Sequence, residues 1–340
     1  METKLPTVSF KLSTVFLLFM ACCLNPQLLQ SQSIFDLMDH KEVLELQIFT
    51  NMDQLDSMRK TNNYQPATLS FRNTDNETSK WAVKIRPRGK YRRRICEKPP
   101  LKLNFVKKQL VAANLNKDDE LKLVTQCTPG RSGKDYILRE YLTYQIFNLL
   151  SEASFQAQLV KIQYNCTATG QTDESWGIVI EDEKSLERRL NAEVCEDCYS
   201  RPKEDFLKEC LSTATLFQYM IGNADYSIVM NRNIKILKTK KEEVYRVAPY
   251  DFDFSGLVNA SYALPNSDYD QTSIRDRVFL GLCNDEELVG TIDHFINKKD
   301  AIINYVDDFD LLSKSSRNDV KKYILKFYKA IENGEIERPE

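Results

Sequence analysis

The stretch "DYILREYLTYQIFNLLS" at residues 135–151 changes the periodicity of the chain from that of strands to that of a helix. Apolar residues lie on almost every side of this helix, so we expect it to be buried. Before it, alternating apolar and polar residues predict strands at 44–50, 67–72, 81–87, 101–105 and 120–124. The connections between these strands are short and polar, which is typical of an antiparallel sheet. The first half of the chain is therefore expected to be β-rich, with one central helix.

The second half has a different pattern. Residues 157–164 and 176–181 still resemble strands, but from about residue 182 the periodicity is mainly helical. A long helix with an apolar face is expected to stop at Gly222. Strands are expected at 233–237 and 243–250, and helices over 273–334. The expected fold is α+β, with a β-rich N-lobe (35–181), a hinge near 176–182 and a mainly helical C-lobe (182–335).

The N-terminus carries the one strongly apolar stretch. Lys4 and Lys11 precede "STVFLLFMACCL", and polar and small residues follow it. This order is typical of a secretory signal, so residues 1–31 are predicted to be a signal peptide cleaved near Ser31. The apolar run is too short for a comfortable membrane span. We expect no transmembrane span after cleavage, and a secreted, periplasmic or cell-envelope location.

Composition narrows the classes of function. The charged residues make up 28% of the chain and almost cancel, with a net charge of -2, so no global basic field favours nucleic acid as a partner. The two histidines, His40 and His294, nearly exclude a Ser-His-Asp triad or a metal site with several histidine ligands. Any chemistry must then rest on carboxylates and lysines.

Seven cysteines follow the predicted signal peptide, an odd number that leaves at least one thiol unpaired. Export would permit disulfides. The pair in "CEDC" (195–198) is half of a possible zinc site, but no second CxxC or CxxH pair exists. A disulfide or two loop thiols is therefore the favoured interpretation.

Two polar stretches are separated by one predicted hairpin: "GNADYSIVMNRNIKIL" (222–237) and "VAPYDFDFSG" (247–256). Phosphoryl transfer needs an Asp to orient or deprotonate the acceptor, and an Asn and a second Asp to hold Mg²⁺. Asp225 fits the first role and Asn233 the second, with Asn231 as the alternative. Asp251 or Asp253 fits the third. Each stretch alone favours a polar turn, but the two together favour a metal–nucleotide site.

Two residues of the N-terminal half are candidates for the nucleotide side. Lys102 alternates with Leu101 and Leu103, so it points away from their face, as either a phosphate-binding or an ordinary solvated lysine. Glu140 lies within the apolar helix, and a buried carboxylate needs a cationic partner. Lys102 is one possible partner of Glu140, and an arginine is another.

The run "RPRGKYRRR" (86–94) concentrates basic residues around Gly89. Arg86 and Arg88 are candidates for binding phosphate groups, because guanidinium forks match phosphate oxygens. A solvated charged turn is equally consistent with this pattern. No Walker A sequence and no GxGxxG motif occurs, which removes the main support for a P-loop or Rossmann site.

Taken in order, "VKIRPRGKYRRR", "KPPLKLNF", "GNADYSIVMNRNIKIL" and "PYDFDFSGL" resemble the spore coat protein H (CotH) kinase family. The stretch "GNAD…N" is also similar to the GN-x-D catalytic loop of HipA-type kinases. The resemblance covers about residues 35–335. It implies a bilobal, protein-kinase-like fold, the cofactors ATP and Mg²⁺ or Mn²⁺, and phosphorylation of Ser or Thr on exported proteins.

The resemblance also implies roles for single residues. Asp225 would be catalytic, and the metal would be held by Asn233 or Asn231 with Asp251 and Asp253. The nucleotide would be bound by Lys102 paired with Glu140, together with Arg86 and Arg88. The spacing from Asp to Asn is six or eight residues, longer than the five of protein kinases and of HipA-type kinases, which leaves the identity of the Asn ligand open.

Two other classes of protein remain as alternatives. In a glycosyltransferase, "DFD" would be a DxD motif that holds a metal and a nucleotide sugar, but that fold favours alternating β and α units before the motif. Residues 44–124 predict consecutive strands instead. A non-catalytic surface or adhesion protein on a kinase-like scaffold is the other alternative, because fold does not determine function. Transfer of AMP would need the same ligands as transfer of phosphate.

Overall fold

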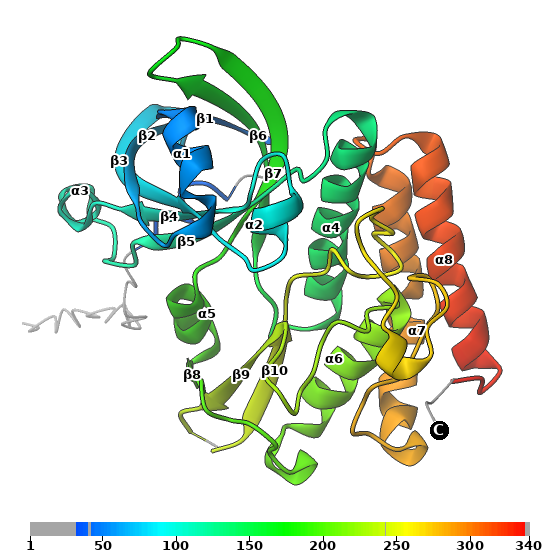
Figure 1. The fold of residues 1–340 in the computed structure, drawn as a ribbon. Helices are drawn as coiled ribbons and strands as arrows, with labels where there is room; N and C mark the ends of the chain where they lie inside the picture. The colour runs from blue at the N-terminus through cyan, green and yellow to red at the C-terminus, as the bar shows by residue number, and fades with distance from the viewer. Residues whose placement is uncertain (1–31, 40–41, 242, 337–340) are drawn as a thin grey trace, which may run out of the picture. The chain divides into compact units, whose positions relative to one another are not determined.

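The computed structural model describes residues 32–39, 42–241 and 243–336 (Figure 1). The predicted signal peptide, residues 1–31, lies outside these residues. No helix within the described ranges combines the length and the apolar character that a membrane crossing requires.

Seven strands close into a barrel in the order β1-β2-β3-β4-β5-β7-β6 (Figure 1). Alternation places one apolar row of each strand inside the barrel, where these rows pack into a separate core with residues such as Ile48 and Ile162. The bounds of the strands are β1 (Leu44–Thr50), β2 (Gln65–Arg72), β3 (Thr78–Pro87), β4 (Leu101–Phe105), β5 (Glu120–Thr125), β6 (Ala157–Cys166) and β7 (Thr172–Ile180).

The closed barrel shows that the expected bilobal, kinase-like fold with an antiparallel N-lobe is wrong. β1 pairs in parallel with β6, with Leu46 opposite Ile162 and Thr50 opposite Cys166, so the sheet is mixed. This pairing joins the two strands that would otherwise form open edges, and a barrel has no edges. The broader α+β class fits the observed elements.

A long helix, α4 (Gly130–Leu150), follows β5 and begins five residues before the expected start. It packs against β6 and β7 of the barrel and against two helices, α6 (Lys208–Ile221) and α7 (Asp285–Asp308). α7 also packs against α8 (Lys314–Glu332). Almost all of α6 is buried, which explains its continuous apolar sequence. Residues 273–284, expected to be helical, are not.

A second sheet contains the two strands expected in the second half and one short strand, β8, that was not expected. Its three antiparallel strands are ordered β10-β9-β8, and the charged hairpin expected between the last two strands joins β9 to β10. The bounds are β8 (Ala192–Val194), β9 (Ile234–Thr239) and β10 (Tyr245–Pro249), preceded by α5 (Glu183–Leu190). The predicted division at residues 181 and 182 falls between β7 and α5, and it stays a prediction.

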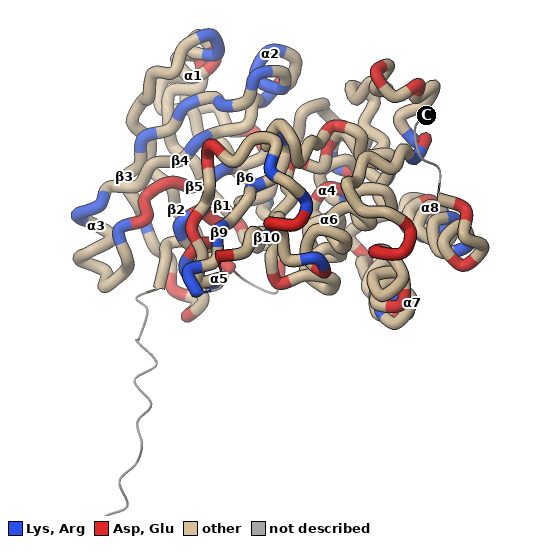
Figure 2. Tube along the Cα trace, turned by 90° about the horizontal axis from the view of Figure 1, so that it is seen from below, with Lys and Arg blue, Asp and Glu red and all other residues tan. Residues whose placement is uncertain are grey.

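Short helices complete the chain, and none of them was expected. They are α1 (Met52–Ser57), α2 (Arg92–Ile95) and α3 (Lys107–Ala112), with single 3₁₀ turns at Met58–Lys60, Lys203–Asp205 and Ser267–Tyr269. Basic and acidic residues are interspersed along the described chain, and basic residues gather at α2 (Figure 2).

Two disulfides form among the described cysteines, Cys96–Cys127 and Cys195–Cys198. The second confirms that "CEDC" is a disulfide rather than half of a zinc site. Three described cysteines are buried and form no disulfide, which agrees with the odd count: Cys166, Cys210 and Cys283.

Candidate active site

A cavity of about 660 Å³ lies where the loop after β3, the segment between α6 and β9, and the loop after β10 meet. Most of the predicted site residues line it. The lining residues are Arg88, Gly89, Lys90, Tyr91, Arg92, Pro100, Asp225, Asn231, Arg232, Asn233, Tyr250, Asp251, Asp253, Phe254 and Leu264.

The turn after α6 determines where Asp225 points. Gly222 ends the helix in the left-handed conformation, and the buried Asn223 follows it. The Oδ1 atom of Asn223 accepts a hydrogen bond of 2.9 Å from the Asp225 backbone N–H. From the far end of the loop, Asn233 Nδ2 donates to the backbone carbonyl of Asp225 at 2.6 Å and to its Oδ2 at 3.0 Å. Because Nδ2 of Asn233 makes these two hydrogen bonds, its Oδ1 atom is the atom that could bind a cation.

The Asp225 carboxylate stands at the cavity wall, partly open to solvent. Its Oδ1 atom lies 3.7 Å from Arg232 Nε, and the Asp225 side chain is 40% exposed. Burial raises the pKa of Asp225 above its ordinary value, and the nearby Arg232 opposes this shift. A carboxylate with a raised pKa is better suited to accept a proton.

The "DFD" segment is anchored to α4. The Asp251 backbone N–H donates to Tyr144 Oη at 2.9 Å, and the ring of Phe252 packs 4.7 Å from that of Tyr144. Tyr144 lies four residues after Glu140, so both project from the same face of α4. This anchoring brings Glu140, Asp251 and Asp253 together, with one oxygen of each within 4.8 Å of the others.

Arg92, the first residue of α2, is the cation beside these carboxylates. Its Nη1 atom lies 3.3 Å from Glu140 Oε2 and 3.5 Å from Asp253 Oδ2, while its Nη2 donates to the Thr125 carbonyl at 2.9 Å. All three charged side chains are almost fully buried. Burial raises the pKa of Glu140 and of Asp253, and the charge of Arg92 opposes that rise.

The carboxylate cluster has acidic oxygens without hydrogen-bond partners and more acidic groups than cations. Glu140 Oε1 and Asp253 Oδ2 are buried and have no hydrogen-bond partner among the described residues. One guanidinium does not neutralise three carboxylates. Buried oxygens with unused lone pairs are the ligands that a hard divalent cation prefers.

The structure corrects the expected partner of Glu140. Lys102 does not reach it, because Lys102 Nζ lies 2.6 Å from Glu120 Oε2 on the neighbouring strand, away from the cavity lining. The arginine that was left open as the alternative is Arg92. The basic run 86–94 was the sequence signal that could have pointed to Arg92. A helix as short as α2 shows no periodicity, so the sequence did not indicate which arginine of the run would point inward.

The two arginines predicted from that run have different places. Arg88 lines the cavity, next to Gly89, whose φ of +83° suits glycine. Arg86 does not line it; its guanidinium lies over the ring of Tyr64 at 5.3 Å. β3 ends at Pro87, so Arg86 is still held on the strand while Arg88 belongs to the loop.

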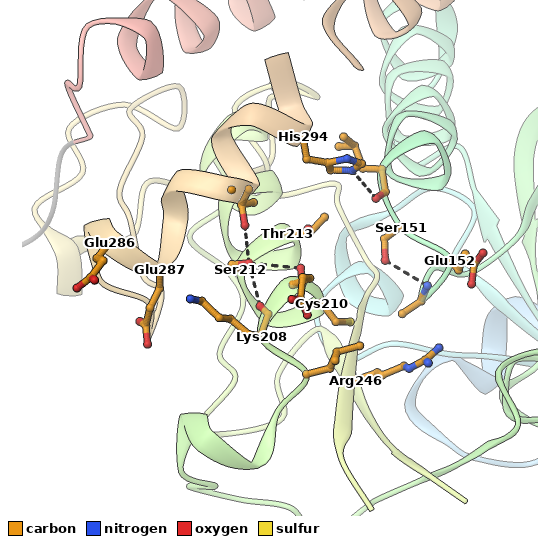
Figure 3. A pocket seen from close by; sticks show the side chains of 16 residues that line it. Ser151, Glu152, Lys208, Cys210, Ser212, Thr213, Arg246, Glu286, Glu287 and His294 are labelled. Carbon is orange, nitrogen blue, oxygen red and sulfur yellow. Dashed lines mark hydrogen bonds between the residues drawn. The ribbon is translucent and has the colours of Figure 1, made fainter. Parts of the chain in front are cut away.

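A separate cavity of about 560 Å³ lies between the end of α4, the start of α6 and the first turns of α7 (Figure 3). Its hydroxyl groups bond to one another, with Ser212 Oγ 2.6 Å from Thr291 Oγ1. His294 Nε2 lies 2.9 Å from the Leu150 carbonyl, so the histidine has a structural partner. None of the predicted site residues lines this cavity.

No protein-family model matches the chain. No curated protein matches it either. Among solved structures, the chain is similar to CtkA, a proinflammatory kinase of Helicobacter pylori, at 13% identity and a TM-score of 0.40. The match covers 68% of this chain and 95% of that one. A likeness this weak carries no argument, so the functional conclusion rests on the geometry of the cavity.

Proposed function

We propose that the chain is an ATP-dependent phosphotransferase that uses Mg²⁺ or Mn²⁺ and phosphorylates Ser or Thr hydroxyl groups of exported proteins. The observation that supports this most is the meeting of two groups of residues in one cavity. Asp251 and Asp253, which form a carboxylate cluster with the buried Glu140, line the same cavity as Asp225 and Asn233. Phosphoryl transfer requires both a metal site and an acceptor-orienting carboxylate.

The residues present fit a divalent cation. Asp251, Asp253 and Glu140 offer carboxylate oxygens, and Asn233 or Asn231 offers a carboxamide oxygen. Asn231 Oδ1 is itself buried and without a hydrogen-bond partner among the described residues. A bound cation would neutralise the charge of the nucleotide phosphates.

The loop after β3 supplies the positive charge for phosphate groups. Arg88 and Lys90 line the cavity on either side of Gly89. The loop is held in place because the Arg88 backbone N–H donates to the Pro100 carbonyl at 2.8 Å. The guanidinium of Arg88 and the ammonium of Lys90 are suited to bind phosphate oxygens.

Asp225 is placed to orient the acceptor hydroxyl and to take its proton. As the acceptor oxygen forms a bond to the γ-phosphorus, the bond from that phosphorus to the leaving diphosphate oxygen breaks. The acceptor proton passes to the Asp225 carboxylate, which Asn233 Nδ2 holds in position. The raised pKa of Asp225 favours this transfer.

Export is the second part of the proposal. It is supported by the signal-like stretch at residues 1–31 and by two disulfides, which persist in oxidising compartments. Acceptors that share this compartment would be exported proteins.

The first test measures the melting temperature with ATP, with and without Mg²⁺ or Mn²⁺. A ligand that binds only the folded state raises the melting temperature. We expect a metal-dependent rise in the wild type that Asp251→Asn loses and Asp75→Asn keeps, because Asp75 lies exposed in the turn between β2 and β3. Absence of any nucleotide-dependent rise would contradict the proposal, and a rise with UDP-sugars alone would favour a glycosyltransferase.

The second test measures transfer. Label on the γ-phosphate of ATP should reach protein and label on the α-phosphate should not, which separates phosphate from AMP transfer. Asp225→Asn should retain the ATP-dependent melting shift and lose transfer by about 10²-fold or more, because it removes the proton acceptor. Unchanged transfer in this variant would show that Asp225 has another role.

A further inference from the structure

We propose that Arg92 is an internal cation that competes with metal for the carboxylate cluster, and that the Cys96–Cys127 disulfide holds it there. Reduction of this disulfide would release the arginine and strengthen metal binding. The inference rests on the proposed metal site and concerns its regulation.

The disulfide connects the element that carries Arg92 to the element that leads to Glu140. α2 begins at Arg92 and ends at Ile95, and Cys96 follows directly. Its partner, Cys127, stands three residues before α4, the helix that carries Glu140. The covalent bond therefore ties α2 to the junction between β5 and α4.

The atoms that hold Arg92 lie beside this bond. Arg92 Nη2 donates to the carbonyl of Thr125, two residues before Cys127. The Cys96 backbone N–H donates to the carbonyl of Arg92 at 3.0 Å, and the Glu97 N–H donates to the Cys127 carbonyl at 3.0 Å. The disulfide is the one covalent link between α2 and this junction; the other contacts that hold α2 are hydrogen bonds, the ion pairs of Arg92 and the packing of Tyr91 on Phe254, and none of these is covalent.

Arg92 occupies space close to that of a bound cation. The candidate ligand oxygens lie within 4.8 Å of one another, and Arg92 Nη1 is 3.3 Å and 3.5 Å from two of the carboxylates that supply them. A dication held by all three carboxylates would stand within a few ångströms of the guanidinium. Repulsion between these like charges in a buried site is large, so displacement of Arg92 should tighten metal binding by roughly tenfold or more.

The redox step needs a dithiol reductant. The dithiol transfers two electrons and two protons to the Cys96–Cys127 bond, which leaves two cysteine thiols and a cyclic disulfide of the reductant. Both cysteines are buried, at 1% and 4% exposure, so α2 must open locally before attack. That opening is the same movement that withdraws Arg92.

The experiment measures Mn²⁺ affinity by titration of the full chain, with Mn²⁺ alone as the probe. Four proteins are compared in oxidised buffer: wild type, Cys96→Ser/Cys127→Ser, Cys195→Ser/Cys198→Ser and Arg92→Gln. The second disulfide is the matched control, since Cys195 and Cys198 line neither the candidate cavity nor the carboxylate cluster. We expect Cys96→Ser/Cys127→Ser and Arg92→Gln to bind Mn²⁺ at least tenfold more tightly than wild type, and the control to match wild type.

A further comparison avoids dependence on one variant. In the Cys195→Ser/Cys198→Ser background, Cys96–Cys127 is the remaining described disulfide, so a dithiol should give the same tightening, with two new thiols counted by alkylation and mass spectrometry. Folding of each protein is verified by a cooperative melting transition.

The outcomes separate the two proposals. Equal Mn²⁺ affinity in all four proteins would overturn the role of Arg92 and the disulfide while leaving the metal site intact. Tightening in Arg92→Gln without tightening after loss or reduction of Cys96–Cys127 would also overturn the proposal, because the disulfide would then not hold the arginine. No Mn²⁺ binding in any protein would overturn the proposed function itself.

Discussion

At the scale of single residues, the carboxylate cluster of Glu140, Asp251 and Asp253 has one buried cation beside it, Arg92. Arg92 contacts two of these carboxylates, Glu140 and Asp253, so the cluster holds more acidic groups than basic ones. Such clusters occur where function requires them, because burying unpaired carboxylates costs stability. The cost should be visible in the pH dependence of folding.

The metal-free protein is expected to lose stability as pH rises from about 5 to 8. Burial raises the pKa of Glu140 to about 8 and that of Asp253 to about 7. The folded state then binds more protons than the unfolded state in this window, so the free energy of unfolding falls with rising pH. The change is at most about 1.4 kcal/mol per pH unit for each group.

Urea unfolding at several pH values with a chelator present measures this slope. Glu140→Gln is an uncharged substitute of similar shape and should flatten it. Mg²⁺ or Mn²⁺ should restore stability at pH 8, because the ionised carboxylates bind it. A slope of the opposite sign would show that burial does not raise the pKa of these two carboxyl groups.

Arg88 and Lys102 were both predicted to bind the nucleotide, but substitutions at the two positions should differ in their effect on nucleotide affinity. Arg88→Ala should weaken ATP binding by about tenfold, since Arg88 lines the cavity and a charge-assisted hydrogen bond contributes about 1.5 kcal/mol or more. Lys102→Ala should leave ATP binding unchanged, because Lys102 pairs with Glu120 outside the cavity. Calorimetric titration measures both, and a larger effect at Lys102 would place the nucleotide elsewhere.

At the scale of elements, the junction between α6 and Asp225 determines the position of the proposed catalytic carboxylate. Gly222 has a φ of +64°, and a Cβ atom there would lie 2.0 Å from Tyr323 Oη. Tyr323 is buried and donates to the Arg275 carbonyl at 3.0 Å, so it is not free to move aside. The turn therefore depends on glycine for both its conformation and its space.

Gly222→Ala is expected to lower the free energy of unfolding by about 2 kcal/mol or more, the sum of a left-handed backbone cost and a steric displacement. Gly290→Ala is the matched control. Gly290 lies inside α7 with no atom within 4 Å of its would-be Cβ, so alanine should stabilise the protein by about 0.5–1 kcal/mol. Urea unfolding of both variants tests the contrast, and equal effects would contradict it.

Elements with clear periodicity were predictable, and those set by long-range contacts were not. Alternation located each barrel strand to within a few residues, and Gly222 was correctly expected to end its helix. The meeting of Asp225 and Asn233 with "DFD" was predicted from their order, and the structure places them at one cavity. The prediction that Lys102 pairs with Glu140 was wrong. The position of Glu140 on a buried helix indicates that it needs a cationic partner, but it does not indicate which loop supplies that partner.

At the scale of the whole molecule, alternation says which face of a strand is buried and nothing about its neighbour. The parallel pairing of β1 with β6 was therefore invisible in the sequence, although it decides between an open antiparallel sheet and a barrel. The same register predicts which substitutions the barrel tolerates.

Ile162→Ala should lower the free energy of unfolding by about 2–5 kcal/mol, because Ile162 is fully buried in the barrel interior opposite Leu46. Lys161→Ala, one position earlier and on the outer face, should change it by no more than about 0.5 kcal/mol. Chemical unfolding measures both. Comparable losses at the two positions would indicate that β6 is not in the observed register.

The parallel closure also governs how the chain folds during synthesis. Gln47 and Gln163 face each other across it, although they are 116 positions apart. Contacts of such high sequence separation slow folding, because loop-closure entropy is lost before the contacts form. Until β6 has left the ribosome, one side of β1 has no partner, and an unpaired strand edge is a template for aggregation. Successful production of this protein should therefore depend on chaperones that protect the nascent first half.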